Sequence, residues 1–392
     1  MKFRKFMRTV PMKLYILLAA VILFSFFSND FGLVDIQKTA IILAAGVDKT
    51  ESGFSVTAQI AVPKGSDRTT GGTSSVEVEA EGQTVSACVA NIYAKTGWVP
   101  KFVFCNLIVI GEDAAADDVF SYLNYFIRDK YMPDSCMVAV CEGKAQELIA
   151  STSAIDDASS LAISKLFSDA SVKSGRVMPN TLKDFSIGYY SPSKSSYLPF
   201  LRAITQEGSQ DSNSGSGSGS GGDAEKQKVY SAEQTALFSE GRMVSVLPEE
   251  LTFAFSLLKG KVSSGNFTAK EQGQDSTLTI IQDEGGVALE MKGAPKAKLS
   301  LELKVRLCCR SFTSDVQGIA NEEAPEELLK SAEEILDGQI KELFATCKES
   351  GCDLFNLRRT LYRSSLKKYA EWKDSLLDIV EPEVKTKVAS MK

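Results

Sequence analysis

The sequence of 392 residues contains no histidine. Without imidazole, the chain has neither a Ser–His nor a Cys–His nucleophile pair, and it lacks the commonest zinc ligand. It also has no Cys-x-x-Cys pair, and acidic pairs such as Asp156-Asp157 have no companion residues at metal-ligand spacing. We therefore expect no catalytic residues, no cofactor and no metal site, and a protein that is not an enzyme.

A long basic run is also missing, and the formal net charge is −6. Proteins that bind nucleic acid normally present clustered Lys and Arg to the phosphates, so we expect no nucleic-acid partner. Hydrophobic residues make up 44% of the chain and charged residues 24%, as in ordinary globular proteins. The length is sufficient for two or three domains, each with its own core.

The cysteines show no clear pairing pattern. An even number outside the cytoplasm normally suggests disulfides. Cys88, however, lies on a predicted helical face and Cys105 in an apolar run, as small core residues do. The adjacent Cys308 and Cys309 would face opposite sides of a strand. We expect mostly buried free thiols and leave the pairing open. The eight cysteines are Cys88, Cys105, Cys136, Cys141, Cys308, Cys309, Cys347 and Cys352.

The amino terminus has the pattern of an export signal. Residues 2–13 carry five Lys or Arg and no acid, and residues 14–27 are almost entirely apolar. The basic flank stays inside, so the remainder would be translocated. Residues before any cleavage point are bulky, and no cysteine follows for lipid attachment. We expect an uncleaved signal anchor over residues 1–30, rather than a cleaved leader, and not a lipoprotein.

The exported part divides at a segment rich in glycine and serine, residues 205–228. Such a tract cannot bury apolar surface, so it is either a linker between domains or a long loop inside one. The predicted regions on its two sides are residues 33–204 and 229–392. Both mix strand and helix patterns, and we predict an α+β fold behind a membrane anchor.

In the first region, alternating residues predict a hairpin of strands 39–47 and 54–62 with a polar turn at 48–53. A helix is expected from Thr84 to Gly97, a strand over 102–110, a helix to about 130 and a strand over 135–141. In the second region, we expect strands within 287–309, a long helix that begins at Pro325, a further helix to about Trp372 and a terminal strand over 378–388.

Several segments carry a resemblance to a known family. Asp35–Asp48, Leu107–Glu112, Leu123–Asp129 and Met137–Ile149 stand in the first region, and Thr235–Leu247 and Asp353–Trp372 stand in the second. In order and spacing they resemble the C subunit of spore germinant receptors, the Ger(x)C family. The chain departs from the family in lacking the lipobox cysteine, the Trp-Asp pair near residues 34–35 and a histidine near residues 104–105.

The positions that match the family motifs are interpreted as structural. Gly46 and Asp48 would serve a turn, and Gly111 and Glu112 would end a strand and begin a helix. Arg128 and Asp129 would form either an internal ion pair with Glu112 or a contact between subunits. Trp372 would anchor a core. A basic helix face would be either solvated or directed at anionic lipid; its residues are Arg358, Arg359, Arg363, Lys367 and Lys368.

The resemblance implies a non-enzymatic subunit of a spore nutrient-germinant receptor, at the extracytoplasmic face of the spore inner membrane. It implies two partners, a larger membrane subunit and a transporter-like multi-span subunit. The alternative is an extracytoplasmic protein that binds a small nutrient in a cleft between its halves. The sequence identifies neither the germinant nor the contact surfaces.

Overall fold

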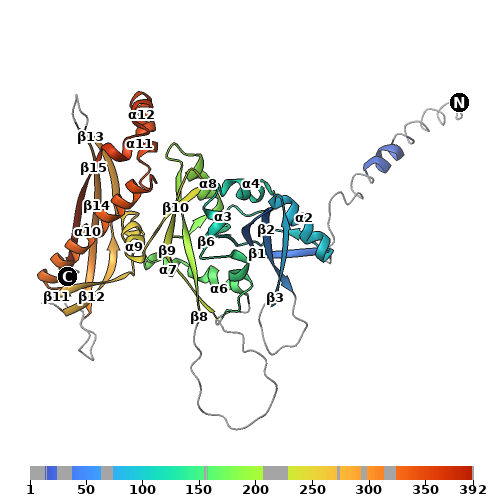
Figure 1. Cartoon of the computed structure of the whole chain (residues 1–392), viewed down its shortest axis with the longest axis horizontal. Coiled ribbons are helices and arrows are strands. Elements are labelled where there is room, and N and C mark those ends of the chain that lie inside the picture. The colour runs from blue at the N-terminus through green and yellow to red at the C-terminus, as the bar shows by residue number, and fades with distance from the viewer. Residues whose placement is uncertain are drawn as a thin grey trace, which may run out of the picture.

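The computed structural model describes residues 14, 16–23, 38–62, 74–153, 156, 158–205, 228–271, 274–292, 298–312 and 324–390. Two β-sheets follow one another along the long axis of the molecule, and helices cover them (Figure 1). The predicted mixed α+β fold is confirmed.

The larger sheet holds ten described strands in the order β10-β9-β8-β6-β5-β1-β2-β3, with β4 beside β1 and β7 beside β6. At its centre β1, β5, β6 and β8 run parallel. The strands are β1 Thr39–Thr50, β2 Gly53–Val62, β3 Ser74–Gly82, β4 Val99–Lys101, β5 Leu107–Gly111, β6 Met137–Cys141, β7 Asn180–Thr181, β8 Ser195–Thr205, β9 Lys228–Ser239 and β10 Arg242–Leu247.

Helices cover both faces of the parallel centre, which explains why every residue of β5 is buried. One core joins the sheet to α2, α4 and α8, and a separate core on the other face joins it to α5 and α6. The helices are α2 Val85–Thr96, α3 Glu112–Ala115, α4 Phe120–Arg128, α5 Ala145–Ile149, α6 Ser159–Leu166, α7 Asp169–Lys173 and α8 Leu182–Tyr190.

The strands on the two sides of the glycine–serine segment are neighbours in this sheet. β8 and β9 pair antiparallel from Ser195↔Ser239 to Thr205↔Lys228. The first two strands after the segment therefore complete the larger sheet. The segment itself, residues 206–227, lies outside the described residues.

The smaller sheet has the order β11-β12-β14-β13, with β15 parallel to β14 on its other side. Helix α10 packs on it through an apolar stripe that includes Leu336, Ile340 and Phe344. The strands are β11 Asn266–Glu271, β12 Gln274–Asp283, β13 Gly286–Lys292, β14 Lys298–Phe312 and β15 Val380–Ser390. The helices are α9 Glu249–Leu258, α10 Glu326–Glu349, α11 Leu357–Ser364, α12 Leu366–Trp372 and α13 Leu376–Ile379.

Helix α9 joins the two sheets. All its residues from Leu251 to Leu258 are buried, as expected of a helix that is apolar on every side. Its core also contains Leu237 and Leu247 of the larger sheet together with Leu278 and Ile280 of the smaller one. A continuous hydrophobic core therefore runs from one sheet into the other.

Three local predictions are wrong. The single helix predicted to about residue 130 is divided into α3, which ends at Ala115, and α4, which begins at Phe120. The polar turn does not begin at Asp48, because β1 continues to Thr50 and only residues 51–52 turn. The strand predicted over 102–110 begins only at Leu107. A turn precedes it, closed by the Cys105 N–H donating to the Phe102 carbonyl at 2.9 Å. This turn buries Phe102 and Cys105 but leaves Phe104 61% exposed, so this mostly apolar run does not form one strand.

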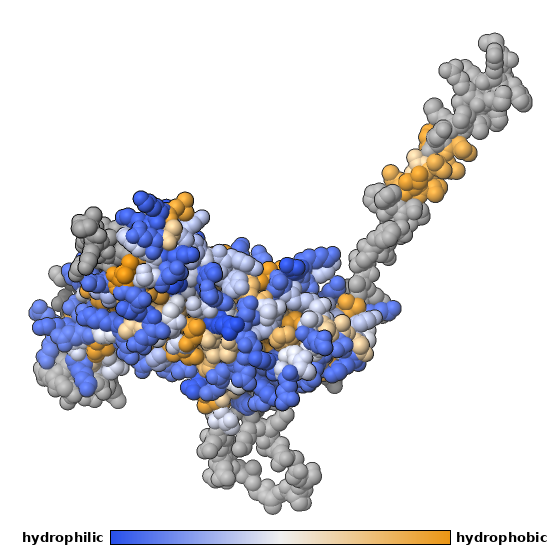
Figure 2. Space-filling view, turned by 45° about the horizontal axis from the view of Figure 1, so that its top comes forward, coloured by the Kyte–Doolittle hydropathy of each residue, from blue (hydrophilic) through white to orange (hydrophobic). Residues whose placement is uncertain are grey.

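Most of the predicted anchor lies outside the described residues. Leu14 and residues 16–23 are helical, and their large apolar side chains are exposed (Figure 2). Among the residues that the structure describes, no helix combines the length and apolarity needed to cross a membrane. The signal anchor stays a prediction.

The six described thiols are free and buried. Burial raises the pKa of the Cys141 and Cys347 thiols well above the ordinary value, which slows their reaction as thiolates. In a Cys308→Ser/Cys309→Ser variant, we expect almost no reaction with a chromogenic disulfide reagent in the native state. In denaturant without reductant, all six should react. Fewer than six reactive thiols would indicate a native disulfide.

Candidate functional site

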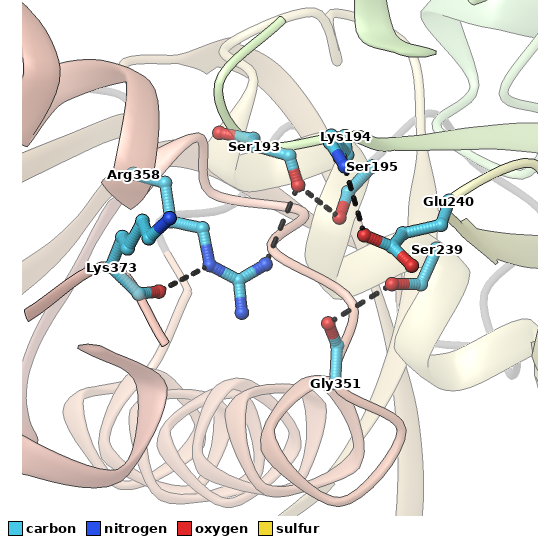
Figure 3. Close-up of polar contacts among 8 residues, drawn as sticks. All are labelled: Ser193, Lys194, Ser195, Ser239, Glu240, Gly351, Arg358 and Lys373. Atoms are coloured by element: carbon cyan, nitrogen blue, oxygen red, sulfur yellow. Dashed lines mark hydrogen bonds and ion pairs between the residues drawn. The ribbon is translucent and has the colours of Figure 1, made fainter. Parts of the chain in front are cut away.

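The described residues hold no group of acidic or cysteine side chains that fits a metal ion. A polar network instead lies at a joint between the two sheets. We define the joint as residues 193–195 and 238–240 of the larger sheet and residues 351–358 beyond α10 (Figure 3). There Ser239 Oγ donates to the Gly351 carbonyl at 3.4 Å, and the Cys352 thiol donates to the Phe238 carbonyl at 3.4 Å. Two hydrogen bonds therefore connect the larger sheet directly to the segment that follows α10.

Asp353 is the centre of the joint and is only 1% exposed. Its N–H donates to Ser195 Oγ at 2.9 Å. Its carboxylate accepts the N–H groups of Leu357 at 2.7 Å and Arg358 at 2.8 Å, so it caps the start of α11. Burial raises the pKa of Asp353, and these hydrogen bonds oppose the rise. Asp353 thus orders α11 through its carboxylate and attaches to the larger sheet through its backbone N–H.

Arg358 and Ser193 complete the network. The Arg358 guanidinium donates to the carbonyl of Ser193 at 3.4 Å and to that of Lys373 at 2.8 Å. The Arg359 N–H donates to Ser193 Oγ at 3.2 Å. The start of α11 and the end of α12 are thereby held against the same loop of the larger sheet (Figure 3).

The joint also concentrates unusual backbone geometry. The three described non-glycine residues with positive φ are Lys194 at 47°, Glu240 at 51° and Asn356 at 57°, and all three lie in it. This conformation is unfavourable for residues with a Cβ, although asparagine tolerates it. The Glu240 N–H donates to the Lys194 carbonyl at 2.8 Å. Strain of this kind persists only where surrounding contacts hold it, so the joint is a constrained structure.

Four of the predicted motif positions meet elsewhere, at the carboxyl ends of β1, β5 and β6. Asp48 is 6% exposed. Its carboxylate accepts the N–H groups of Ala145 at 2.7 Å and Gln146 at 2.8 Å, at the start of α5. Burial raises the pKa of Asp48, and the two hydrogen bonds oppose that shift. Asp48 therefore caps a helix 97 residues away rather than its own turn.

The two glycines allow this close packing. A Cβ on Gly46 would lie 2.9 Å from Ile149 Cδ1 of α5, and a Cβ on Gly111 would overlap the Asp48 carboxylate. Gly46 lies within β1 and has an ordinary negative φ, so its predicted role in a turn is wrong. Sequence patterns cannot show that its function is to admit a neighbouring helix.

Glu112 closes the network at the start of α3. Its N–H donates to the Gly143 carbonyl at 2.9 Å, and its carboxylate accepts the Gly143 N–H at 3.1 Å. The Asp48 and Glu112 carboxylates are thus occupied by backbone groups. The cluster holds loops together and presents no free acid–base pair.

The predicted ion pair of Arg128 or Asp129 with Glu112 is absent from the described structure. Arg128 Nε donates to Asn124 Oδ1 at 3.0 Å, and Asp129 accepts the Tyr131 N–H at 2.8 Å. Glu112 follows the carboxyl end of β5, whereas α4 leads back to the amino end of β6, which runs parallel to β5. A contact between subunits at these two residues stays a prediction.

Trp372 is half-buried and packs against the core of the smaller sheet. The predicted basic helix is divided at Ser365 into α11 and α12. Arg358 is used in the joint, whereas Arg359, Arg363 and Lys367 are exposed.

The sequence patterns did not predict that Asp353, Ser193 and Ser195 take part in the joint. An acid four residues before a helical pattern was a usable signal for a helix cap. The two serines carried no local signal, because their partners are 158 to 166 residues away.

Asp283, at the end of β12, predicts a pH dependence. Burial raises its pKa to about 7, above its ordinary value. The contribution of protonated Asp283 to the free energy of unfolding is therefore fully present below about pH 4, and it is lost as the pH rises through 7. Asp283→Asn should gain stability over the wild type between pH 5 and pH 8, by on the order of 1–2 kcal/mol. Denaturant unfolding across this range measures it.

Glu284→Gln is the matched control for this prediction. It removes only a neighbouring charge that makes a smaller contribution to the raised pKa of Asp283. Most of the decline in the free energy of unfolding between pH 5 and pH 8 should remain in this variant. A wild-type stability that does not change over the same range would contradict the raised pKa.

Comparison with known proteins agrees with this fold. A model described as "Spore germination protein N-terminal domain" matches residues 33–203, and one described as "Spore germination B3/ GerAC like, C-terminal" matches residues 233–390. No curated protein matches the chain significantly. The solved structure titled "Crystal Structure of the GerBC protein" is 13% identical with a TM-score of 0.50, and the match covers 89% of this chain and 97% of that one.

The second family model begins within β9, so its first strands lie in the larger sheet. The two models together match most of the chain in the expected order. The chain belongs to the spore germination GerAC/GerBC family, whose members are C subunits of germinant receptors.

Proposed function

We propose that this chain is a non-enzymatic receptor subunit, tethered to the outer face of the spore inner membrane. It assembles there with a larger membrane subunit and a transporter-like multi-span subunit, and the assembly triggers germination in response to nutrients. The observation that carries the proposal is the match of both family models, in order, over residues 33–203 and 233–390.

Two physical features support an assembly role. The amino-terminal pattern of five cations followed by apolar residues 14–27 suits a tether. Tethering raises the effective concentration of the folded part near its membrane partners. The polar groups of the joint and of the Asp48 cluster bind backbone atoms, so they stiffen the folded part that would contact those partners.

Affinity capture from spore membranes tests the proposal. The full-length chain with a carboxy-terminal tag, solubilised in mild detergent, should retain both membrane subunits. A variant that lacks residues 2–30 should be recovered in the soluble fraction and should retain neither. Recovery of the full-length chain in the cytosol, without membrane partners, would overturn the proposal.

A further inference from the structure

A polar pocket of about 280 Å³ lies beside the joint. Its walls come from β7, β8 and α8 of the larger sheet, from the segment after α9, and from the start of α11. The volume is at the lower end of the range for ligand sites and suits a small metabolite. The polar residues that matter below are Asn180, Asp184, Ser196, Lys259, Lys261 and Arg359.

The charge in this pocket is not balanced. Three cations, Lys259, Lys261 and Arg359, face one acid, Asp184. The salt bridges between described residues include none of these three cations. Desolvation and then the nearby charge of Lys261 lower the pKa of Lys259, whose Nζ lies 5.1 Å from the centre of the Phe255 ring. The pocket therefore has an excess of two positive charges, and like charges at close range repel in the empty state.

One wall offers a fixed hydroxyl. Asn180 Nδ2 donates to the Tyr197 carbonyl at 2.8 Å and to Ser196 Oγ at 3.4 Å. Ser196 is 8% exposed. Because its oxygen accepts from Asn180, its proton remains available to donate to an anionic oxygen. The pocket thus combines a hydrogen-bond donor with cations that form no salt bridge to another described residue, as in sites for carboxylate or phosphate groups.

We propose that this pocket binds a small dianion, either a dicarboxylate or a phosphate. Its two negative charges match the excess positive charge of the site. Because Asn180 and Ser196 belong to the larger sheet and Arg359 belongs to α11 beyond α10, an anion bound between them holds the two parts together. The site does not depend on the proposed receptor role, since membrane capture and anion binding are measured separately.

Thermal unfolding and calorimetric titration of the full-length chain in detergent test this site. Succinate and inorganic phosphate are the probes, and L-alanine, which carries no net charge, is the comparison. We expect saturable one-to-one binding of succinate or phosphate, with a raised Tm. Saturation by succinate alone would assign the site to dicarboxylates, and saturation by phosphate alone would assign it to phosphates. L-alanine binding without dianion binding would overturn the proposal.

The variant Lys261→Gln/Arg359→Gln should weaken dianion binding at least about tenfold, because charge-assisted hydrogen bonds are lost. Both positions are exposed, so the fold should be kept. Lys330→Gln/Lys341→Gln on α10 makes the same charge change away from the pocket and should bind as the wild type does. Equal weakening in both variants would show a general charge effect and would overturn the site. Absence of binding to the wild type would do the same.

Discussion

Replacement of Asp353 by alanine should lower the free energy of unfolding by about 3 kcal/mol. The substitution leaves the N–H groups of Leu357 and Arg358 without their acceptor at a site where Asp353 is 1% exposed. It also removes the cap of α11, which attaches to the larger sheet. Urea unfolding of the full-length chain in detergent measures the loss.

Two further variants make this prediction specific. Asp353→Asn keeps one acceptor oxygen and should lose less than the alanine variant. Asp378→Ala removes an exposed acid whose pair with Lys348 spans 3.7 Å, and it should change stability by less than about 0.5 kcal/mol. Equal stability of Asp353→Ala and Asp378→Ala would show that Asp353 does not hold the joint.

Gly111→Ala should lower the free energy of unfolding by a similar amount, about 3 kcal/mol. The new Cβ would overlap the Asp48 carboxylate and lie 3.2 Å from the Gly143 carbonyl. Asp48 would then have to leave the N–H groups of Ala145 and Gln146. The φ of Gly111 is −64°, which alanine adopts freely, so backbone strain does not contribute to the loss.

Gly338→Ala is the matched control. Gly338 lies inside α10, and a Cβ there would meet no atom within 4 Å. Alanine should therefore stabilise the chain by up to about 1 kcal/mol, through its higher helix propensity. If the two alanine variants changed stability equally, crowding at Gly111 would be refuted as the cause.

Local sequence patterns predicted most of the regular elements. Alternation gave the hairpin of β1 and β2, and the cap at Thr84 with the stop at Gly97 gave α2. Both signals act within a few residues. The predicted end of an element was wrong where an apolar run contained a turn, as at Phe104. Burial of Phe102 and Cys105 does not require a strand.

Contacts between distant residues could not be predicted in the same way. Asp48 and Ala145 are 97 residues apart, and Asp353 and Ser195 are 158 residues apart. A capping aspartate looks the same in sequence whether it binds its own turn or another segment. The family resemblance located Gly46, Asp48, Gly111 and Glu112, but only the fold explains why glycines and carboxylates stand together there.

The joint links the two structural parts to the proposed function. A continuous core through α9 and a closed network around Asp353 fix the sheets relative to each other. The cationic pocket beside this network lets a small anion add to the same contacts. In the proposed receptor, a ligand-stabilised joint would transmit binding through a rigid body.

Deletion of the gene from a spore-former without paralogues tests the receptor assignment most directly. Spores should lose or strongly reduce their response to nutrients but still germinate with a cationic detergent, which bypasses receptors. Expression of the full-length chain should restore the response. Wild-type nutrient germination in the deletion strain would contradict the account.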